Sequence, residues 1–320
     1  MKISVAIPCY KVKEQILSVI KRIPAQVEKI YVVDDCCPEQ SGLLVQAQCD
    51  DPRVSIVFHE FNQGVGGAMI TAYRQALEDK MDIVVKIDGD GQMDPALLPL
   101  FIEPIVQGRA DYTKGNRFFN LETLIAMPAL RKFGNAALSF VNKCSSGYWN
   151  VMDPTNGYTA IHCQTLALLP LDKLSTRYFF ESDILFRLGT VRAVVRDVSM
   201  AAIYADEKSN LQIKKVILEF PWLYLKAFFK RVFYNYFLRD FNGASLELVL
   251  GLLLILLGAS WGVEHWFSSI ISQQVASSGT VMLAVLPIII GFQLMLSAIQ
   301  FDMANIPRDP LQKYLRAIKK

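Results

Sequence analysis

The chain has 320 residues, enough for one large α/β domain and a smaller part, and 52% of its residues are hydrophobic. Its net charge is only +3, which argues against the strongly basic surface of a nucleic-acid-binding protein, so nucleic acid is not expected as a partner. Three histidines argue against a histidine-built metal site or a Ser/His triad, and six cysteines without metal-type spacing are typical of reduced cytosolic thiols.

Short apolar strands alternate with amphipathic helices through the first third of the chain. We expect strands at residues 3–7, 30–33, 54–58 and 83–87, with helices near 12–22, 41–48, 67–78 and 95–106. This alternation predicts a mainly parallel sheet, in which ligands bind beyond the carboxyl ends of the strands. Pro8, Tyr10 and Asp35 stand at two of these ends. The first strand begins at once and is too short for a signal peptide, so the domain is expected in the cytosol.

Residues 62–68 form a glycine-rich segment before the third helix. It lacks the Gly-Lys-Ser/Thr of a P-loop and the position of a dinucleotide-binding fingerprint. The helix N-terminus around Gly66 offers backbone donors to a nucleotide, and a tight strand-to-helix turn accounts for the glycines equally well.

The apolar strand at residues 83–87 leads into Asp88-Gly-Asp90-Gly-Gln92. Two carboxylates one residue apart and a carboxamide two residues further on direct three oxygen ligands towards one point. Mg²⁺ or Mn²⁺ suits this ligand set. The glycines leave room for a bulky anion, such as a diphosphate, to share the ion.

The same motif also suggests a calcium-binding loop or a hairpin turn. A helix-loop-helix calcium site is excluded by spacing, because Met93 and Pro99 stand where that loop needs a glycine and a glutamate. A hairpin turn at Asp-Gly remains an alternative, but a turn requires neither the second Asp-Gly nor Gln92. The pattern therefore favours a metal site.

The middle of the chain adds further candidate residues. A strand at 111–114 leads to Arg117, a helix at 128–143 carries Arg131, and an ordered loop at 153–158 begins with Asp153. A later helix opens with Glu181 and Asp183 in its first turn, where acidic residues also occur for helix-dipole reasons alone.

The last third of the chain predicts membrane association. Residues 211–240 combine aromatic residues with Lys and Arg at helical spacing, which predicts amphipathic helices in the membrane interface, broken near Pro221. Charge-poor stretches then predict transmembrane helices near 244–263 and 280–301. Lys and Arg occur on both flanks and are absent from the connector at 265–279, so both flanks are expected in the cytosol.

These features predict four parts. A catalytic domain is expected at 1–210, amphipathic interface helices at 211–240, two transmembrane helices at 241–303, and a basic cytosolic tail at 304–320. The protein is expected in the inner (plasma) membrane with two spans, with the catalytic domain and both termini on the cytosolic side.

With these motifs, the sequence resembles glycosyltransferase family 2, and within it the polyprenyl-phosphate glycosyltransferases similar to dolichyl-phosphate mannose synthase. The likeness covers nearly the whole chain and rests on residues 5–10, 32–35, 62–68, 88–92, 115–117, Arg131 and 153–158. It implies an α/β fold of the GT-A (Rossmann-like) type. The implied reaction is an inverting, metal-dependent transfer of one sugar from a UDP- or GDP-sugar to undecaprenyl or dolichyl phosphate.

The resemblance also implies roles for single residues. It places Pro8, Tyr10 and Asp35 at the base and ribose of the nucleotide, Asp88, Asp90 and Gln92 around Mg²⁺ or Mn²⁺, and Arg117 and Arg131 at phosphates. A phosphate monoester is largely dianionic at neutral pH and needs no general base, so the arginines are expected to bind the acceptor phosphate. Asp153, Glu181 and Asp183 are then expected to position the sugar or the acceptor, with helix capping as the alternative for Glu181 and Asp183.

The sequence departs from the family pattern in three places. Cys36-Cys37 replaces the usual small polar residues after the paired aspartates, and the late basic motif survives only as Lys208-Ser209, with Lys208 the expected nucleotide contact. A Gln-x-x-Arg-Trp segment is absent, which disfavours a processive polysaccharide synthase.

Two alternative functions stay open at this point. One is a membrane-anchored family 2 enzyme that uses a soluble saccharide or a protein acceptor. The other is a noncatalytic nucleotide-sugar-binding subunit of a membrane assembly, which has less need of the Asp88–Asp90 metal site. The sugar and the choice between UDP and GDP are not fixed by the sequence, and a homo-oligomer is left open.

Overall fold

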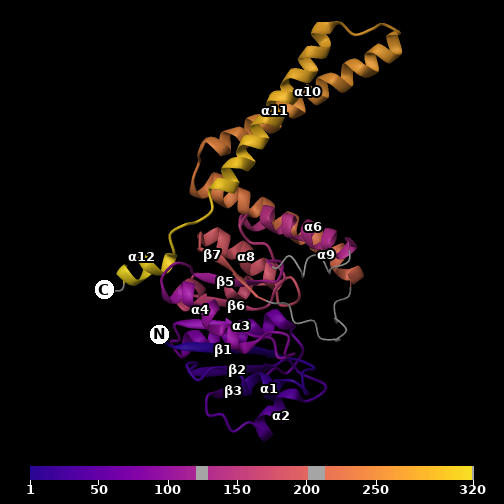
Figure 1. Cartoon of the computed structure of the whole chain (residues 1–320). Helices are drawn as coiled ribbons and strands as arrows, with labels where there is room; N and C mark the ends of the chain where they lie inside the picture. The colour runs from indigo at the N-terminus through magenta and orange to yellow at the C-terminus, as the bar shows by residue number, and fades with distance from the viewer. Residues whose placement is uncertain (120–128, 201–212, 319–320) are drawn as a thin grey trace. The chain divides into compact units, whose positions relative to one another are not determined.

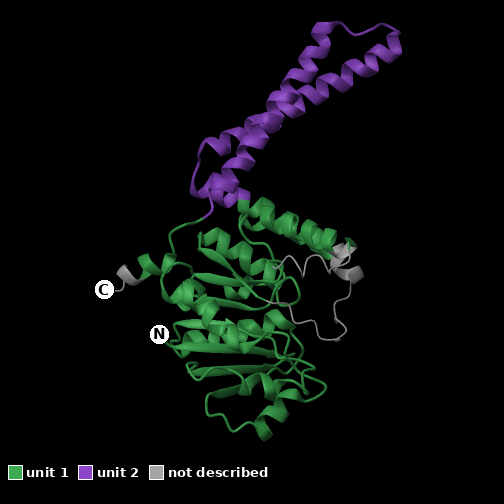
Figure 2. Cartoon of the chain, viewed as in Figure 1, with its two compact units in different colours: residues 1–231, 307–320 green, residues 232–306 purple. Residues whose placement is uncertain are grey.

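The computed structural model describes residues 1–119, 129–200 and 213–318. It contains two compact units (Figure 2). Unit 1 comprises Met1–Arg231 and Pro307–Lys320, and unit 2 comprises Val232–Ile306. The chain therefore leaves unit 1 once, forms unit 2, and returns to unit 1.

Unit 1 is built on a seven-stranded sheet with the strand order β3-β2-β1-β4-β6-β5-β7 (Figure 1). The strands are β1 (Ile3–Cys9), β2 (Lys29–Asp34), β3 (Val54–Phe58), β4 (Ile83–Lys86), β5 (Tyr112–Asn116), β6 (Thr159–His162) and β7 (Val195–Ser199). The first four strands are parallel, as predicted. β6 runs antiparallel to both β4 and β5, while β7 is parallel to β5, so the sheet is mixed.

Helices cover both faces of this sheet. One face packs against α3 (Val65–Glu78), α7 (Cys163–Leu166) and α8 (Phe180–Val191), and the other against α1 (Ile16–Lys21), α2 (Ser41–Gln48) and α4 (Leu98–Val106). The helix expected at 95–106 begins as a 3₁₀ turn (Pro95–Leu97) before α4.

Residues along each central strand alternate between the two apolar cores. On β4, Val84 belongs to the core beneath α3 and α8, whereas Ile83 and Val85 belong to the core beneath α1 and α4. This is the two-residue period of a strand that is buried on both faces, and it explains why the strands are almost continuously apolar.

Two further helices lie over α8. Gly189 of α8 approaches α6 (Ala129–Ser146) so closely that a Cβ there would lie 2.3 Å from the carbonyl oxygen of Ser146. From α9 (Ile213–Phe233), Tyr224 shares a hydrogen bond of 2.6 Å with Ser182, and Arg231 donates to the carbonyl oxygen of Cys144. These contacts dock α9 on unit 1.

The expected break at Pro221 is wrong, because α9 continues through it. A proline removes one hydrogen-bond donor and displaces one carbonyl, which a helix can absorb when tertiary contacts hold it. Phe220 directly precedes Pro221, and Tyr224 follows it by three positions. Both rings pack edge-on against Phe179. A short π-helix at Tyr234–Arg239 follows α9.

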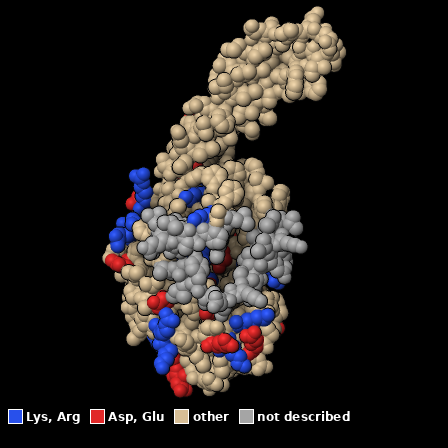
Figure 3. All heavy atoms as spheres, turned by 45° about the vertical axis from the view of Figure 1, so that its right-hand side comes forward, with Lys and Arg blue, Asp and Glu red and all other residues tan. Residues whose placement is uncertain are grey.

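Unit 2 is dominated by two long antiparallel helices, α10 (Gly243–Ser272) and α11 (Ser278–Ala304). Their most apolar 18-residue windows have mean hydropathies of 2.1 and 2.3, and only 11% of each window is buried. They are therefore long and apolar enough to cross a membrane. Figure 3 shows over this hairpin almost none of the charged side chains that mark unit 1.

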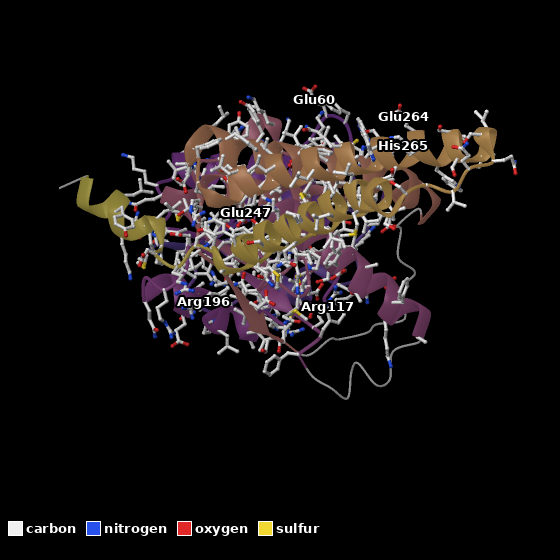
Figure 4. All side chains as sticks on the ribbon, turned by 90° about the horizontal axis from the view of Figure 1, so that it is seen from above. Glu60, Arg117, Arg196, Glu247, Glu264 and His265 are labelled. Carbon is white, nitrogen blue, oxygen red and sulfur yellow. The ribbon has the colours of Figure 1, made fainter. Side chains whose placement is uncertain are left out.

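Small residues allow the two helices of unit 2 to pack closely. A Cβ at Gly258 would lie 2.5 Å from the carbonyl oxygen of Ala284, and one at Gly291 would lie 2.6 Å from that of Gly251. Glu247, labelled in Figure 4, accepts a hydrogen bond of 2.8 Å from Ser297. Close approach at glycines with an interhelical polar contact is typical of membrane helix pairs.

The segment expected as a basic tail contains helix α12 (Leu311–Ile318), which belongs to unit 1. The buried carboxylate of Asp111 accepts the backbone N–H groups of Leu311 and Gln312 at 2.9 and 3.0 Å. The Gln312 side chain is also buried and donates to the carbonyl oxygens of Ile105 and Ala110. A side chain 200 positions away in the sequence thus caps this helix.

The hydrogen bonds that attach α12 to the rest of unit 1 lead to a stability prediction. Gln312→Ala removes two hydrogen bonds to backbone carbonyls, so we expect the free energy of unfolding of unit 1 to fall by about 1–2 kcal/mol. Tyr314→Ala on the same helix removes an exposed side chain and serves as the control, with a change below about 0.5 kcal/mol. Thermal or denaturant unfolding of the detergent-solubilised protein measures both. Equal effects of the two substitutions would show that the Gln312 hydrogen bonds do not stabilise unit 1.

Candidate active site

The carboxyl ends of β1, β2 and β4 lie at one edge of the sheet, because these strands are adjacent and parallel. The loops that follow them carry Tyr10, Asp35 and the Asp88–Gln92 motif. β6 enters from the opposite direction beside β4, with Thr159 paired to Lys86. The loop at 153–158 that precedes β6 is thereby brought to the same edge.

The three expected metal ligands follow the end of β4. Asp88, Asp90 and Gln92 are all half-buried, and 29% of the Asp88 side chain is exposed. Asp90 Oδ1 accepts the backbone N–H of Gln92 at 3.0 Å, which fixes the turn between them. Both carboxylates therefore stand at the surface of the site and close to each other in the chain.

A buried lysine lies directly behind Asp88. Lys86 is 1% exposed, and its Nζ lies 2.6 Å from Asp88 Oδ1 and 3.5 Å from Glu181 Oε1 at the start of α8. Burial acts to lower the pKa of Lys86, but the charges of Asp88 and Glu181 outweigh burial, so the net shift of the pKa is upward. Lys86 is thus a buried ammonium shared by two carboxylates.

The loop at 153–158 touches this ion pair through Gly157. A Cβ at Gly157 would lie 2.5 Å from Lys86 Nζ and 2.6 Å from Asp88 Oδ2. A side chain at this position would displace the carboxylate or the ammonium. Glycine is therefore required here by close approach, and the loop forms one wall of the site.

The structure brings two of the expected catalytic residues together as an ion pair. Arg117, labelled in Figure 4, follows β5, and Asp153 is fully buried. Arg117 Nε donates to Asp153 Oδ2 at 2.7 Å and Nη2 donates to Oδ1 at 3.0 Å, which is a two-pronged contact. Asp153 therefore contacts Arg117, and its own burial fits a role in orienting the guanidinium better than direct contact with a substrate.

A second buried lysine supports the same loop. Lys114 on β5 is fully buried and donates to the carbonyl oxygen of Asn156 at 2.6 Å. Burial lowers its pKa to about 8, and the nearby charges of Glu181 and Asp153 act in the opposite direction. The site therefore lies over a buried layer of charge that joins β4, β5 and α8.

Asp35 has extensive contacts within the protein. It is 2% exposed, its two oxygens accept the backbone N–H groups of Gln63 and Gly64 at 2.8 and 2.7 Å, and Oδ1 lies 2.8 Å from His59 Nδ1. His59 Nε2 in turn lies 2.9 Å from Thr71 Oγ1. Asp35 thus holds the glycine-rich segment, and its contact with a nucleotide stays a prediction.

The glycine-rich segment packs against protein backbone. Gly64 has a positive φ of 87°, and a Cβ at Gly66 would lie 2.2 Å from the carbonyl oxygen of Ser175. Gly67 donates its N–H to the carbonyl oxygen of Thr176 at 3.0 Å. These contacts explain the glycines as a tight turn, and a nucleotide contact at Gly66 stays a prediction.

The unusual Cys36-Cys37 pair lies in the turn after β2. Cys36 is exposed with φ of 52°, whereas Cys37 is buried. Cys37 Sγ accepts the N–H of Lys11 at 3.1 Å and lies 3.2 Å from Ser41 Oγ. Burial acts to raise the pKa of Cys37, but these hydrogen bonds outweigh it and the pKa is lowered. Cys37 therefore links the loops that follow β1 and β2.

The remaining expected residues are placed as follows. Pro8 is half-buried near the end of β1, and Tyr10 is exposed just beyond it. Arg131 lies in the first turn of α6, although its side chain is outside the described part of the chain. Lys208 lies outside the described residues altogether.

The site fits a divalent ion that is shared with a substrate. Within residues 1–119, 129–200 and 213–318, no group of three or more His, Cys, Asp or Glu side chains is arranged to enclose a metal. Mg²⁺ is commonly held by one or two carboxylates together with substrate phosphates. Asp88 and Asp90, at the edge of the sheet and beside a wall without side chain at Gly157, match that arrangement.

Sequence reasoning missed Lys86 and Lys114. Lys86 could have been singled out, because it is a lysine at the end of a strand that is otherwise apolar and precedes Asp88 by two positions. The partner of Lys86, Glu181, was expected to position the sugar or the acceptor or to cap its helix, and its pairing with Lys86 was not predicted. Asp183, by contrast, accepts the N–H of Ser175 and pairs with Arg187, which explains it structurally.

Comparison with known proteins identifies the family of the chain. The sequence model of Glycosyl transferase family 2 matches residues 4–166. A UDP-N-acetylglucosamine–dolichyl-phosphate N-acetylglucosaminyltransferase from Methanococcus voltae is 28% identical over 62% of this chain and 85% of its own length. An undecaprenyl-phosphate mannosyltransferase from Micrococcus luteus is 29% identical over 65% of this chain and 85% of its own length. A dolichol-phosphate mannosyltransferase from Pyrococcus furiosus is 25% identical over 68% of this chain and 61% of its own length.

Solved structures share the fold. Glucosyl-3-phosphoglycerate synthase from Mycobacterium tuberculosis in complex with UDP superposes with a TM-score of 0.53 and 18% identity, covering 72% of this chain and 79% of that one. The same enzyme with Mn²⁺, UDP and product gives a TM-score of 0.52. The expected GT-A-like α/β fold is confirmed, and the chain belongs to glycosyl transferase family 2.

Proposed function

We propose that this protein transfers one sugar, with inversion, from a nucleotide sugar to a polyprenyl phosphate at the membrane. The observation that carries the proposal is the joint position of Asp88, Asp90 and the Arg117–Asp153 pair at one edge of the sheet, in a chain with two helices apolar enough to span a membrane. Relatives named as dolichyl-phosphate and undecaprenyl-phosphate sugar transferases support the lipid acceptor.

The donor site is proposed at Asp88, Asp90 and Gln92, with Pro8, Tyr10, Asp35, Gly66 and Lys208 at the nucleotide. A bound Mg²⁺ or Mn²⁺ would act as a Lewis acid for the charge that develops on the nucleoside diphosphate leaving group. Asp88 and Asp90 would hold it, and Gly157, which packs directly against Asp88 Oδ2, puts no side chain over this carboxylate. Relatives named for different sugars, mannose and N-acetylglucosamine, mean that similarity does not assign the sugar.

The acceptor site is proposed at Arg117 and Arg131. An acceptor phosphate and a donor diphosphate repel each other, and a guanidinium beside them offsets this repulsion while it fixes the direction of attack. Asp153 holds Arg117 by two hydrogen bonds, which orients the guanidinium without placing the buried carboxylate on the substrate. The phosphate nucleophile needs no general base.

The membrane arrangement is proposed as a hairpin with both ends on the cytosolic side. The segments that flank unit 2 both belong to unit 1, which supports an arrangement in which the two ends of the hairpin lie on the same side of the membrane. The chain would comprise a catalytic domain at 1–210, interface helices at 211–240, membrane helices at 241–303 and a cytosolic end at 304–320 that contains α12. Exposed Trp222 and Phe229 on α9 support an interfacial position.

The first prediction for this function concerns the reaction itself. Detergent-solubilised full-length protein, incubated with a panel of UDP- and GDP-sugars and with undecaprenyl or dolichyl phosphate, should transfer labelled sugar into the lipid fraction when Mg²⁺ or Mn²⁺ is present. Asp90→Asn should lower turnover by about 100-fold or more without a change in Tm, because it removes one metal ligand. Asp90 is preferred to Asp88 because Asp88 also pairs with a buried lysine.

Two results would contradict the proposal. Turnover that persists in a chelator would remove the metal from the mechanism. Label that enters only a water-soluble saccharide or a protein would favour the alternative of a membrane-anchored enzyme with a soluble acceptor.

The second prediction concerns the Arg117–Asp153 pair. Arg117→Lys and Asp153→Asn should each raise the apparent KM for the lipid phosphate or lower kcat by about tenfold, because both disrupt the two-pronged contact that orients the guanidinium. UDP binding measured by calorimetry should change less than about twofold. Arg196→Lys on β7 alters an exposed arginine and serves as the control.

Loss of UDP affinity with normal acceptor kinetics would assign Arg117 to the donor diphosphate. Measuring Tm for each variant separates this result from unfolding, because a weaker contact between Arg117 and the buried residue at position 153 also lowers stability.

A further inference from the structure

Lys86 and Glu181 form a charged group behind the candidate metal ligands that the reaction described above does not use. Lys86 occupies the last position of β4, and the two-residue period of the strand places it on the α8 side, in line with Val84. Glu181 lies in the first turn of α8, on that same face of the sheet. The two residues come from elements about 95 positions apart and meet beneath Asp88.

The buried ammonium of Lys86 is paired with two carboxylates. An isolated ammonium in the protein interior is strongly unfavourable unless it is paired. Lys86 Nζ contacts Asp88 Oδ1 at 2.6 Å and Glu181 Oε1 at 3.5 Å, and 14% of the Glu181 side chain is exposed. The closer contact takes one oxygen of Asp88, so the orientation of this carboxylate depends on how the ammonium is shared with Glu181.

Helix capping does not explain Glu181. The neighbouring Asp183 has the contacts expected of a structural acid, since it accepts the N–H of Ser175 at 2.7 Å and pairs with Arg187. The ion pair of Glu181 is instead with Lys86, which joins it to a residue of the candidate site. Two acids in one helical turn therefore have different partners and, we expect, different tasks.

We propose that Lys86 and Glu181 are positioning residues that set the affinity of the site for its divalent ion through Asp88. Glu181 shares the Lys86 ammonium, which weakens the ion pair between Lys86 and Asp88 and leaves Asp88 available to a cation. Without Glu181, the ammonium pairs with Asp88 alone and competes with the ion for Oδ1. This inference rests on the proposed metal site at Asp88 and Asp90.

The test measures binding of Mn²⁺ to the full-length protein with saturating UDP, by the decrease in the electron paramagnetic resonance signal of free Mn²⁺. Glu181→Gln should weaken Mn²⁺ binding by about tenfold, within the range of coupling between contacting groups. Asp183→Asn, in the same helical turn, is the matched control and should change the Kd by less than about twofold. The expected effect needs no turnover, so it is separate from loss of activity.

A second comparison asks whether Lys86 transmits the effect. In a Lys86→Met background, Glu181→Gln should change the Mn²⁺ Kd by less than about twofold, because the shared ammonium is gone. Lys86→Gln, which removes the charge but retains a donor, replaces Lys86→Met if the latter does not fold. Tm values show which variants are folded.

Three outcomes would overturn the inference. If Glu181→Gln binds Mn²⁺ as the wild type does, the ion pair serves only the fold. If Glu181→Gln weakens binding equally with and without Lys86, Glu181 acts by its own charge and not through Lys86. If the wild-type protein with bound UDP takes up no Mn²⁺, the proposed metal site fails, and this inference fails with it.

Discussion

The pairing of β4 determines what surrounds the candidate site. β4 is parallel to β1 on one side and antiparallel to β6 on the other. The parallel neighbour brings the loop after β1 to the edge where Asp88 stands, and the antiparallel neighbour brings the loop before β6 to the same edge. Gly157 then lies against Asp88 and Lys86 with no room for a side chain. A fully parallel sheet would have carried the 153–158 loop to the opposite edge.

Charge inside unit 1 is arranged around this edge. Lys86, Lys114 and Asp153 are all buried, and each is paired or hydrogen-bonded to a residue that reaches the site. Buried charges of this kind are costly, and removing one partner destabilises the fold. Their concentration under the Asp88–Asp90 motif is most simply explained by the need to hold ligands in fixed directions.

Local pattern was sufficient for part of this structure. The helix at 41–48 and the strand at 54–58 were predicted to the residue, because turn residues mark both ends, and the two apolar helices of unit 2 were predicted from the absence of charge. The helix expected from residue 12 begins only at Ile16. β6 and β7 were missed, since four- and five-residue strands with polar positions carry little periodic signal.

Long-range contacts could not be predicted in the same way. Asp111 holds α12 across 200 positions, and Arg117 holds Asp153 across 36, yet neither pair has a spacing that any local rule describes. The expected site residues near 88–92 were found because they are neighbours in the chain. Lys86 and Glu181 required the register of β4 and the position of α8.

We propose above that Asp88 and Asp90 hold a divalent ion against the diphosphate of a nucleotide sugar. The most direct measurement is the anomalous diffraction of Mn²⁺ in crystals of the full-length protein grown with UDP. We expect one strong Mn²⁺ peak within bonding distance of carboxylate oxygens of Asp88 or Asp90 and of the UDP diphosphate. Ordered UDP at the carboxyl edge of β1 and β4 with no Mn²⁺ peak beside these residues, or a peak elsewhere, would contradict it.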